Sequence, residues 1–216
     1  MLIGPMPRKP RQSGFSLIEL MIVVAIGLII LGFAIPNYIT ARRNYRIAGD
    51  ARNMKSELLL AKMRAAARFT RTRVRFNTVA RSFQTEIWNR DTDVWDLIVV
   101  GSPTTLSVGV NYGFGTMTAP PINPEDGSAT QTTLEMPPIC KVGAADLPGA
   151  GADIPNTTCI VFNSRGYPVD DGGTINGQRA IYVTDGNAVE GATLSVTGIA
   201  RIWRGDASDA TYWIKR

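Results

Sequence analysis

Residues 15–35 read FSLIELMIVVAIGLIILGFAI, an apolar run of 21 residues in which the charged side chain is Glu19. As a helix rising about 1.5 Å per residue, this run would span about 30 Å, the thickness of the hydrocarbon core of a bilayer. The residues before it are polar, and their charges are the basic Arg8, Lys9 and Arg11. The positive-inside rule keeps this basic end in the cytoplasm. The sequence therefore predicts one membrane-spanning helix with the rest of the chain on the far side.

A cleaved secretory signal peptide is the main alternative for this segment. The apolar run is about twice as long as the apolar core of a typical signal peptide. It is followed by Pro36, Asn37 and an Arg-rich segment, and not by the small residues of a signal-peptidase site or by the cysteine of a lipoprotein signal. These features favour a retained helix, and a plain signal anchor stays open as an interpretation.

Glu19 is the residue that a plain anchor does not explain. An ionisable side chain at the centre of a membrane span costs roughly 2.5 to 3.5 kcal/mol on insertion scales, so a functional role with a partner is the default hypothesis. No basic residue lies between Phe15 and Thr40 in the sequence. The partner is therefore expected from outside this segment, or as a newly formed amine.

Residues 13–20, SGFSLIEL, resemble the class III signal of type IV pilins and type II secretion pseudopilins. The resemblance implies that a prepilin peptidase cleaves after Gly14 and methylates the new N-terminal Phe15. Glu19 would then be the assembly residue, and its implied partner is the N-terminal amine of a neighbouring subunit. Pro36 falls where family members often carry a proline that softens or kinks the helix.

The segment after the apolar run is expected to continue the helix as an amphipathic stretch over residues 36–72. Apolar residues recur there at steps of three and four, which places them on one helical face. They are Ile47, Ala51, Met54, Leu58, Ala61, Ala65 and Phe69. This stripe predicts a helix that packs under a globular head.

The formal charge of +5 divides unevenly along the chain. Residues 36–76 hold 11 basic and two acidic residues, whereas residues 77–216 hold nine basic and 15 acidic ones. A basic stalk of +9 thus precedes an acidic head of −6. The simpler interpretation is a solvated helix face, with Asp50 and Glu57 in ion pairs within the helix or with neighbouring subunits.

The alternative interpretation of the basic stalk is DNA binding, because clustered arginines release counterions from phosphate. Arg64, Arg68 and Arg71 are the candidates for contact with DNA or with a protein partner. A DNA-binding minor pilin acting in DNA uptake is therefore the alternative function, and nucleic acid is the less favoured partner because a helix packed in a filament hides much of such a stripe.

Beyond residue 72 the sequence changes to short β-rich runs with turn residues between them. Strands are expected at 73–77, 81–88, 94–100, 105–110, 159–163, 180–184 and 193–203. Gly, Pro and Asp are densest in residues 119–156, which predicts an irregular loop region. A helix followed by strands is typical of the α+β class. We expect a long helix packed on a C-terminal antiparallel β-sheet head.

Two local features of the head carry further expectations. Cys140 and Cys159 are expected to form a disulfide, since thiols oxidise on the far side of a bacterial inner membrane, with two independent thiols as the alternative. Residues 170–173, DDGG, are expected to form a turn, because the spaced oxygen ligands of a calcium loop are absent from the sequence.

The C-terminal half of the head also resembles that of H-type pseudopilins and FimT/FimU-type minor pilins. The residues that carry this resemblance are 160–168 (IVFNSRGYP), 180–184 and 194–202, although a generic β-hairpin would share the pattern. Certain FimT-like minor pilins bind DNA through a Gly-Arg-x-Arg motif. This chain reads Gly198-Ile199-Ala200-Arg201, a departure that argues against that role.

The sequence contains no histidine, which removes Ser/His/Asp and Cys/His catalysis and histidine metal sites. We therefore expect no enzymatic activity, no catalytic residue, no metal and no cofactor.

The expected partners are the prepilin peptidase, other pilins or pseudopilins, and an inner-membrane assembly platform. The expected location is the inner membrane with a periplasmic head, and then a pilus or pseudopilus. The expected segments are a cleaved leader at 1–14, a membrane or filament-core helix at 15–35, the amphipathic helix at 36–72 and the head at 73–216.

Overall fold

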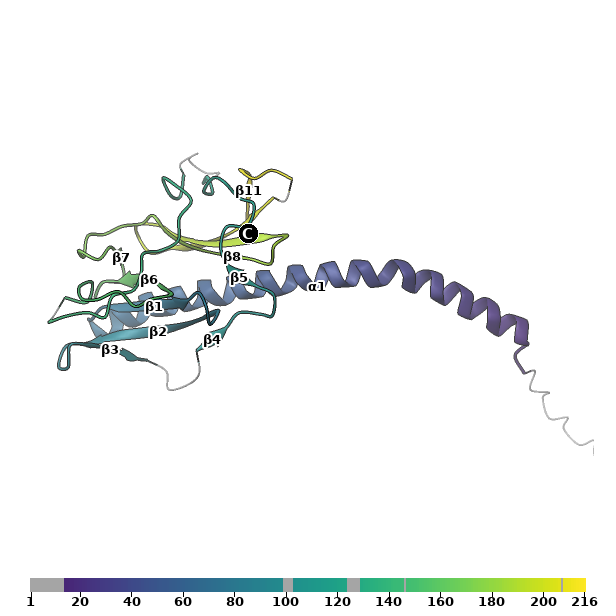
Figure 1. The fold of residues 1–216 in the computed structure, drawn as a ribbon, viewed down its shortest axis with the longest axis horizontal. Coiled ribbons are helices and arrows are strands. Elements are labelled where there is room, and N and C mark those ends of the chain that lie inside the picture. Colours follow the sequence, from purple (N-terminus) through teal and green to yellow (C-terminus); the bar gives the residue numbers. More distant parts are fainter. Residues whose placement is uncertain (1–13, 99–102, 124–128, 146, 207) are drawn as a thin grey trace, which may run out of the picture. The chain divides into compact units, whose positions relative to one another are not determined.

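The computed structural model describes residues 14–98, 103–123, 129–145, 147–206 and 208–216. The chain divides after Arg42 into an N-terminal unit and a compact unit that comprises residues 43–216. Helix α1 (Leu17–Arg68) contributes residues to both units. All strands lie in the second unit, where they form two antiparallel sheets in the described part of the chain (Figure 1). The α+β class expected from the sequence is confirmed.

The first sheet has the order β3-β2-β1-β6-β7, with β4 paired to β2. Its strands are β1 (Thr72–Asn77), β2 (Ser82–Asn89), β3 (Val94–Leu97), β4 (Thr104–Thr105), β6 (Thr157–Phe162) and β7 (Pro168–Val169). Strand β1 is central, because Val74 lies opposite Thr85 of β2 on one side and opposite Ile160 of β6 on the other.

The second sheet has the order β11-β10-β9-β8-β5. Its strands are β5 (Asn111–Tyr112), β8 (Arg179–Thr184), β9 (Val189–Leu194), β10 (Ala200–Gly205) and β11 (Trp213–Lys215). The sequence predicts one sheet, and the division into two is a finding of the structure. Both sheets need a common apolar surface, and the helix provides it.

The main hydrophobic core is formed by the apolar stripe of α1 and the inner faces of both sheets (Figure 1). Six stripe residues have no exposed surface, namely Ile47, Ala51, Met54, Leu58, Ala61 and Ala65. The first sheet contributes Val74 and Phe76 to this core, and the second contributes Ile181 and Val183. Alanines on the stripe let the strands approach the helix closely, so one helix face is sufficient to hold two sheets.

A second core covers the outer face of the second sheet. Side chains alternate along β8, so Ala180 and Tyr182 point away from the helix and pack with Trp203 and Trp213. Parts of the irregular region cover them, and the Tyr182 hydroxyl donates a hydrogen bond to buried Gln131 over 2.6 Å. The irregular region, which lies between β5 and β6 in the sequence, thus covers this face of the second sheet.

Two of the expected strands are wrong. Residues 193–203 form a hairpin and not one strand, because Gly198 has φ of 71° and its N–H donates to the Ser195 carbonyl. Residues 106–110 form a turn after β4, where the Val110 N–H donates to the Ser107 carbonyl. The turn at 170–173 is present as expected, with the Gly173 N–H bonded to the Asp170 carbonyl.

A disulfide joins Cys140 to Cys159, with 5.0 Å between their Cα atoms. Cys159 lies on β6, and its N–H also donates to the Pro138 carbonyl. The bridge therefore attaches the C-terminal part of the irregular region to the first sheet.

A buried ion pair holds the residue next to this bridge. Arg73 of β1 donates to the Glu86 carboxylate over 2.6 Å, with both side chains 3% exposed, and to the Lys141 carbonyl over 2.5 Å. Its guanidinium also lies 4.2 Å from the centre of the Trp95 ring. Burial lowers the pKa of Arg73, against the attraction of Glu86, which raises it. The hydrogen bonds and the ring contact offset part of the desolvation of this charge.

We expect reduction of the disulfide, or the Cys140→Ser variant, to destabilise the head by about 3 kcal/mol, because the bridge restricts a loop of moderate length in the unfolded chain. Denaturant unfolding with and without reductant measures this change. The Cys140→Ser variant serves as the control, since reductant should leave its midpoint unchanged. An unchanged midpoint for the parent protein under reductant would contradict the expectation.

Candidate functional site

The N-terminal end of α1 brings together the residues on which the sequence analysis places processing and assembly. Gly14 and Phe15 precede the helix, and the Phe15 side chain is 86% exposed. The helix begins at Leu17, and the carbonyl of Ser16 accepts the N–H of Leu20 over 3.1 Å. Glu19 lies in the first turn and is exposed in the single chain.

The spacing of Ser16 and Glu19 is that of a capping box, S-x-x-E, with Ser16 before the first helical residue. A carboxylate in the first turn also interacts favourably with the helix dipole. The side-chain hydrogen bonds that complete a capping box are not formed in the described chain, so the dipole is the local contribution of Glu19 to the start of the helix. The sequence analysis missed this contribution, although the position of Glu19 near the start of the apolar run was readable there. Any test of an assembly role has to separate the two.

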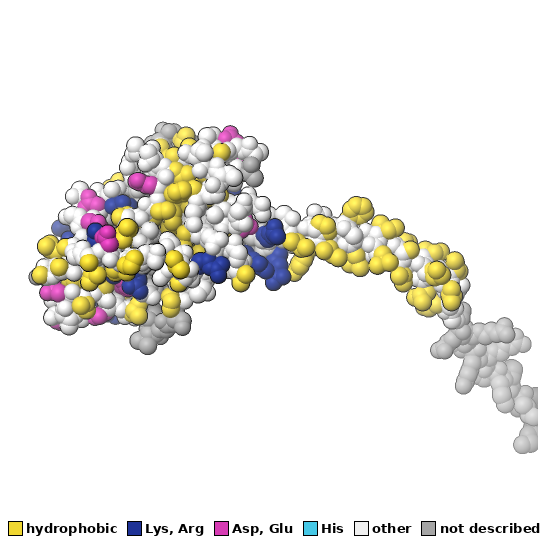
Figure 2. All heavy atoms as spheres, in the orientation of Figure 1, with side chains coloured by type: hydrophobic (Ala, Val, Ile, Leu, Met, Phe, Trp, Pro, Cys, Tyr) yellow, Lys and Arg dark blue, Asp and Glu magenta, His cyan; other side chains and the backbone are white. Residues whose placement is uncertain are grey.

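The apolar side chains of residues 17–39 lie on the surface of the chain. The apolar part of α1 is long enough to cross a membrane, and its side chains are not buried against the rest of the chain. By length and composition this helix qualifies as a membrane span. Figure 2 shows the hydrophobic side chains that cover it. Exposed apolar surface of this extent needs lipid or protein around it.

Pro36 lies inside α1, where its ring removes one backbone N–H from the helix. Its own carbonyl accepts the Thr40 hydroxyl over 3.1 Å, in addition to the backbone ladder. Both features weaken the regular hydrogen bonding of this turn. They make Pro36 the chemically expected place for the helix to bend.

The two acidic residues of the stalk bind the head. Asp50 is 5% exposed and accepts the Ser107 N–H over 2.9 Å and the Ser107 hydroxyl over 3.0 Å. Burial raises the pKa of Asp50, although the two hydrogen bonds lower it. Glu57 accepts the hydroxyl of Thr85 on β2. The structure does not show the expected ion pairs of Asp50 and Glu57 with arginines of the helix among the described residues.

The three arginines proposed for DNA or partner contact do not share one environment. Arg64 is partly buried, and its Nη1 is enclosed without a hydrogen-bond partner among the described residues. Arg68 is exposed in the last turn of α1. Arg71 follows the helix and lines a cavity of the head. Of the three, Arg68 is the one fully exposed to solvent.

Glu190 of β9 is a buried charge that the sequence analysis did not single out. It has no exposed surface, and neither carboxylate oxygen has a hydrogen-bond donor among the described residues. Arg204 and Arg216 approach one of these oxygens at 3.6 and 3.8 Å. Burial raises the pKa of Glu190, against the attraction of Arg216, Arg204 and Arg52, which lowers it. Alternation along a strand places Glu190 on a face but gives no signal of this cluster.

Among the described residues, no three His, Cys, Asp or Glu side chains come together in a way that could hold a metal ion. The site at the N-terminal end of α1 therefore offers one carboxylate, one chain segment before the helix and a large apolar surface. Such a set of groups is suited to association, with the carboxylate as the polar determinant.

The family model described as the prokaryotic N-terminal methylation motif matches residues 9–35. The match ends before the head begins, and it includes Gly14, Phe15 and Glu19. It supports a type IV pilin-like or pseudopilin precursor whose apolar helix anchors it in a membrane. No curated protein and no solved structure matches the chain.

The raised pKa of Glu190 predicts a pH dependence of stability. A carboxyl whose pKa is higher in the folded state binds its proton more tightly there, so folding is favoured at low pH. This contribution is lost as the pH rises from the ordinary value of 4.5 through the raised value. Relative to the parent protein, Glu190→Gln should therefore gain stability as the pH increases from 4.5 towards neutrality.

Denaturant unfolding of the two proteins across that pH range measures this difference. Arg165→Gln, which changes an exposed charge of the same head, is the control and should run parallel to the parent protein. A stability difference between Glu190→Gln and the parent that does not vary with pH would contradict the prediction.

Proposed function

We propose that this protein is a minor pilin or pseudopilin, a structural subunit that joins a type IV pilus or a type II secretion pseudopilus. The observation that carries the proposal is the lone carboxylate of Glu19 in the first turn of a helix whose apolar surface is exposed, within a matched methylation motif. The head is then presented by the filament, and the protein has no catalytic role. The C-terminal resemblance to H-type pseudopilins and FimT/FimU-type minor pilins supports the minor-subunit assignment.

In this proposal a prepilin peptidase removes residues 1–14 and methylates Phe15. The cut precedes the apolar run, so the helix is retained as the anchor. Removal of the leader lowers the formal charge from +5 to +2 and creates an amine at Phe15. That amine is the cation that the apolar segment itself lacks.

The assembly step follows from the cost of an isolated charge in an apolar environment. When helices pack side by side in a filament core, Glu19 of one subunit leaves water, and so does the amine of Phe15 in a neighbour. Pairing the two neutralises both charges, whereas removing one partner leaves the other unpaired at a cost of several kcal/mol. Glu19 would thus select subunits that are processed and placed in the correct axial position. Pro36 would let the helix adjust to its neighbours.

The DNA-uptake alternative needs an exposed basic surface. Arg64 is partly buried and Arg71 lines a cavity, so Arg68 is the fully exposed member of the proposed set. We therefore do not favour DNA uptake for this protein.

The first test is the chemical identity of the mature N-terminus. Mass spectrometry of the protein purified from its host membranes should find a chain that begins with N-methyl-Phe15. Inactivation of the host's prepilin peptidase is the control, because the purified protein should then keep its intact leader. A mature chain that begins with Met1, or beyond Ile35, would refute the processing assignment.

The second test concerns Glu19. Glu19→Gln should be inserted and processed but depleted from filaments by at least about tenfold, since 1.4 kcal/mol already corresponds to a factor of ten and an unpaired buried charge costs more. Immunoblots of membrane and sheared filament fractions measure the two amounts. Ser16→Ala is the matched control, because it changes the residue before the first helical turn without removing the charge. Equal depletion of both variants would indicate a role in starting the helix and would overturn the assembly role.

A further inference from the structure

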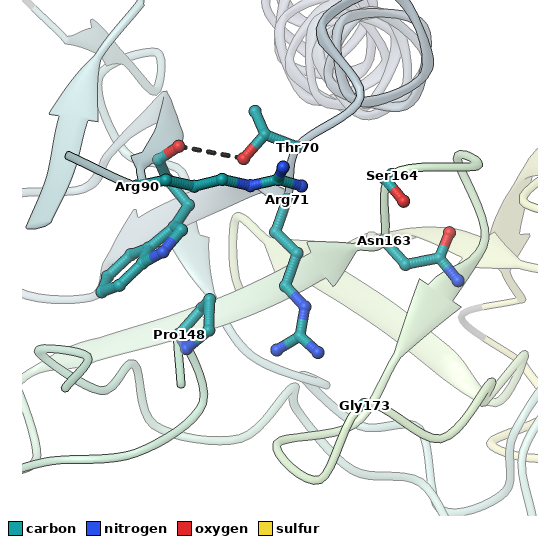
Figure 3. Close-up of a pocket in the computed structure, with 8 residues that line it drawn as sticks. Thr70, Arg71, Arg90, Pro148, Asn163, Ser164 and Gly173 are labelled. Carbon is teal, nitrogen blue, oxygen red and sulfur yellow. Dashed lines mark hydrogen bonds between the residues drawn. The ribbon is translucent and has the colours of Figure 1, made fainter. Parts of the chain in front are cut away.

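A cavity of about 420 Å³ lies in the head beside the C-terminal end of α1 (Figure 3). Its lining comes from the segment after the helix, the end of β2, the irregular region and the turns on either side of β7. The lining residues are Thr70, Arg71, Trp88, Arg90, Pro148, Asn163, Ser164 and Gly173. All of them belong to the compact unit of residues 43–216.

Two arginines give this cavity its charge. Figure 3 shows Arg71 reaching between Pro148 and Gly173. The Arg71 side chain has no ion pair or hydrogen bond within the described part of the chain, whereas Arg90 donates one N–H to the Phe69 carbonyl over 2.7 Å. Among the described residues that line the cavity, none is acidic. Most of the lining belongs to residues 77–216, a segment whose net charge is −6. The cavity is thus a positive site in an acidic part of the chain.

Because residue 173 is a glycine, the Arg71 guanidinium has room to lie against this turn. The φ of Gly173 is 84°, in the turn that begins at Asp170, and a Cβ at this position would lie 2.9 Å from Arg71 Nη2. The Asp170 carboxylate accepts the Thr174 N–H over 2.8 Å within this turn, and no ion pair joins it to Arg71 among the described residues. The turn therefore supplies space for the cation without a direct contact between the two charges.

Asn163 and Ser164 add neutral donors on another wall. The Asn163 side-chain oxygen accepts the backbone N–H groups of Arg165 and Tyr167, each over 3.0 Å. These two bonds orient the amide so that its NH₂ group is left as a donor. The Ser164 hydroxyl has no hydrogen bond to any described residue, so it too is available.

Trp88 is the buried aromatic residue of the lining, and its ring carries an unsatisfied donor. The residue is 4% exposed, and its indole Nε1 is buried without a hydrogen-bond partner among the described residues. The other three tryptophans donate their indole N–H groups, Trp95 to Pro148, Trp203 to Thr193 and Trp213 to Ala119. An unsatisfied buried donor is unfavourable, and the other three tryptophans avoid it.

The position of the Trp88 ring is fixed by its neighbours. A Cβ at Gly143 would lie 2.4 Å from Trp88 Cζ3, so the benzo edge of the ring faces Gly143. The pyrrole edge lies away from Gly143, and Nε1 itself has almost no accessible surface, so other atoms of the residue line the cavity. The Trp88 backbone is held as well, because its N–H donates to the Arg71 carbonyl and its carbonyl accepts the Thr70 hydroxyl, the dashed line in Figure 3.

We propose that this cavity binds a small oxyanion, a carboxylate or phosphate group, through Arg71 and Arg90, beside the ring of Trp88. Guanidinium groups present paired N–H donors that match the oxygens of both kinds of anion. The charged groups of the lining are cations, which favours an anionic ligand. The site is independent of Glu19 and of filament assembly, so it goes beyond the proposed function.

The test uses the full chain in neutral detergent micelles, labelled with ¹⁵N, with the indole N–H signals as the readout. Inorganic phosphate and sodium acetate are added in separate titrations at constant ionic strength, maintained with sodium chloride. The Trp88 signal, assigned with Trp88→Phe, should shift saturably in at least one titration while the signals of Trp203 and Trp213 stay in place. A shift with phosphate alone identifies a phosphate site, and a shift with acetate alone identifies a carboxylate site.

Three variants locate the binding. Arg71→Gln and Arg90→Gln should each weaken the binding by at least about tenfold, as expected for loss of a charge-assisted hydrogen bond. Arg165→Gln is the matched control, because it removes an exposed charge next to Ser164 without altering the lining, and it should bind as the parent does. Preserved dispersion of the four indole signals shows that each variant is folded.

The proposal is overturned if no saturable Trp88 shift occurs with either anion. It is also overturned if Arg165→Gln weakens binding as much as Arg71→Gln does, since that result would indicate a general charge effect. Should Arg71→Gln fail to fold, Arg90→Gln decides the question by the same criterion.

Discussion

The packing of one helix face against two sheets is the contact on which the head depends. The stripe from Ile47 to Ala65 is fully buried, and it lies in a single core with residues of both sheets. No β-ladder joins the two sheets among the described strands, so the shared helix face is their main common surface. Tyr112 of β5 adds a direct contact, because its hydroxyl donates to the Ser82 carbonyl of β2 over 3.1 Å and its ring lies 5.9 Å from that of Phe76. The alanines of the stripe matter for the shared helix face, because larger side chains would separate the sheets from the helix.

This packing also fixes the polar contacts that surround the core. With the helix in place, Asp50 meets the turn at Ser107 and Glu57 meets Thr85. On another side, the Lys62 ammonium donates to the carbonyl of Thr197 over 2.7 Å, in the turn between β9 and β10. A Cβ at Gly198 would lie 2.9 Å from the Gly166 carbonyl oxygen, which explains the glycine at this close approach. The helix thus organises the loops as well as the sheets.

Charge along the chain has a different meaning once the fold is known. A basic stalk and an acidic head suggest, from the sequence, that subunits pack head against stalk. In the structure part of that complementarity is used within the chain, because the head residue Glu190 is surrounded by Arg52 of the stalk and by Arg204 and Arg216. The acidic residues of the stalk are likewise directed to the head. What remains for partners is the exposed apolar surface of α1 and the arginines that the head leaves in solvent.

The sequence by itself determined the features that depend on near neighbours: the apolar run with Glu19, the helical stripe and the α+β order of elements. These can be predicted because helical and strand periods repeat within a few residues. The disulfide was expected from the sequence, but two separate thiols stayed open until the fold placed Cys140 and Cys159 with 5.0 Å between their Cα atoms. Tertiary structure alone decided that the strands form two sheets, that residues 193–203 turn back at Gly198, and that the irregular region covers Tyr182 and Trp203. It also decided that Arg71, Trp88 and Asn163 meet in one cavity and that Glu190 is enclosed by arginines. These arrangements bring together residues that are far apart in the chain, because both sheets and their loops pack around one helix. Local periodicity does not predict such contacts.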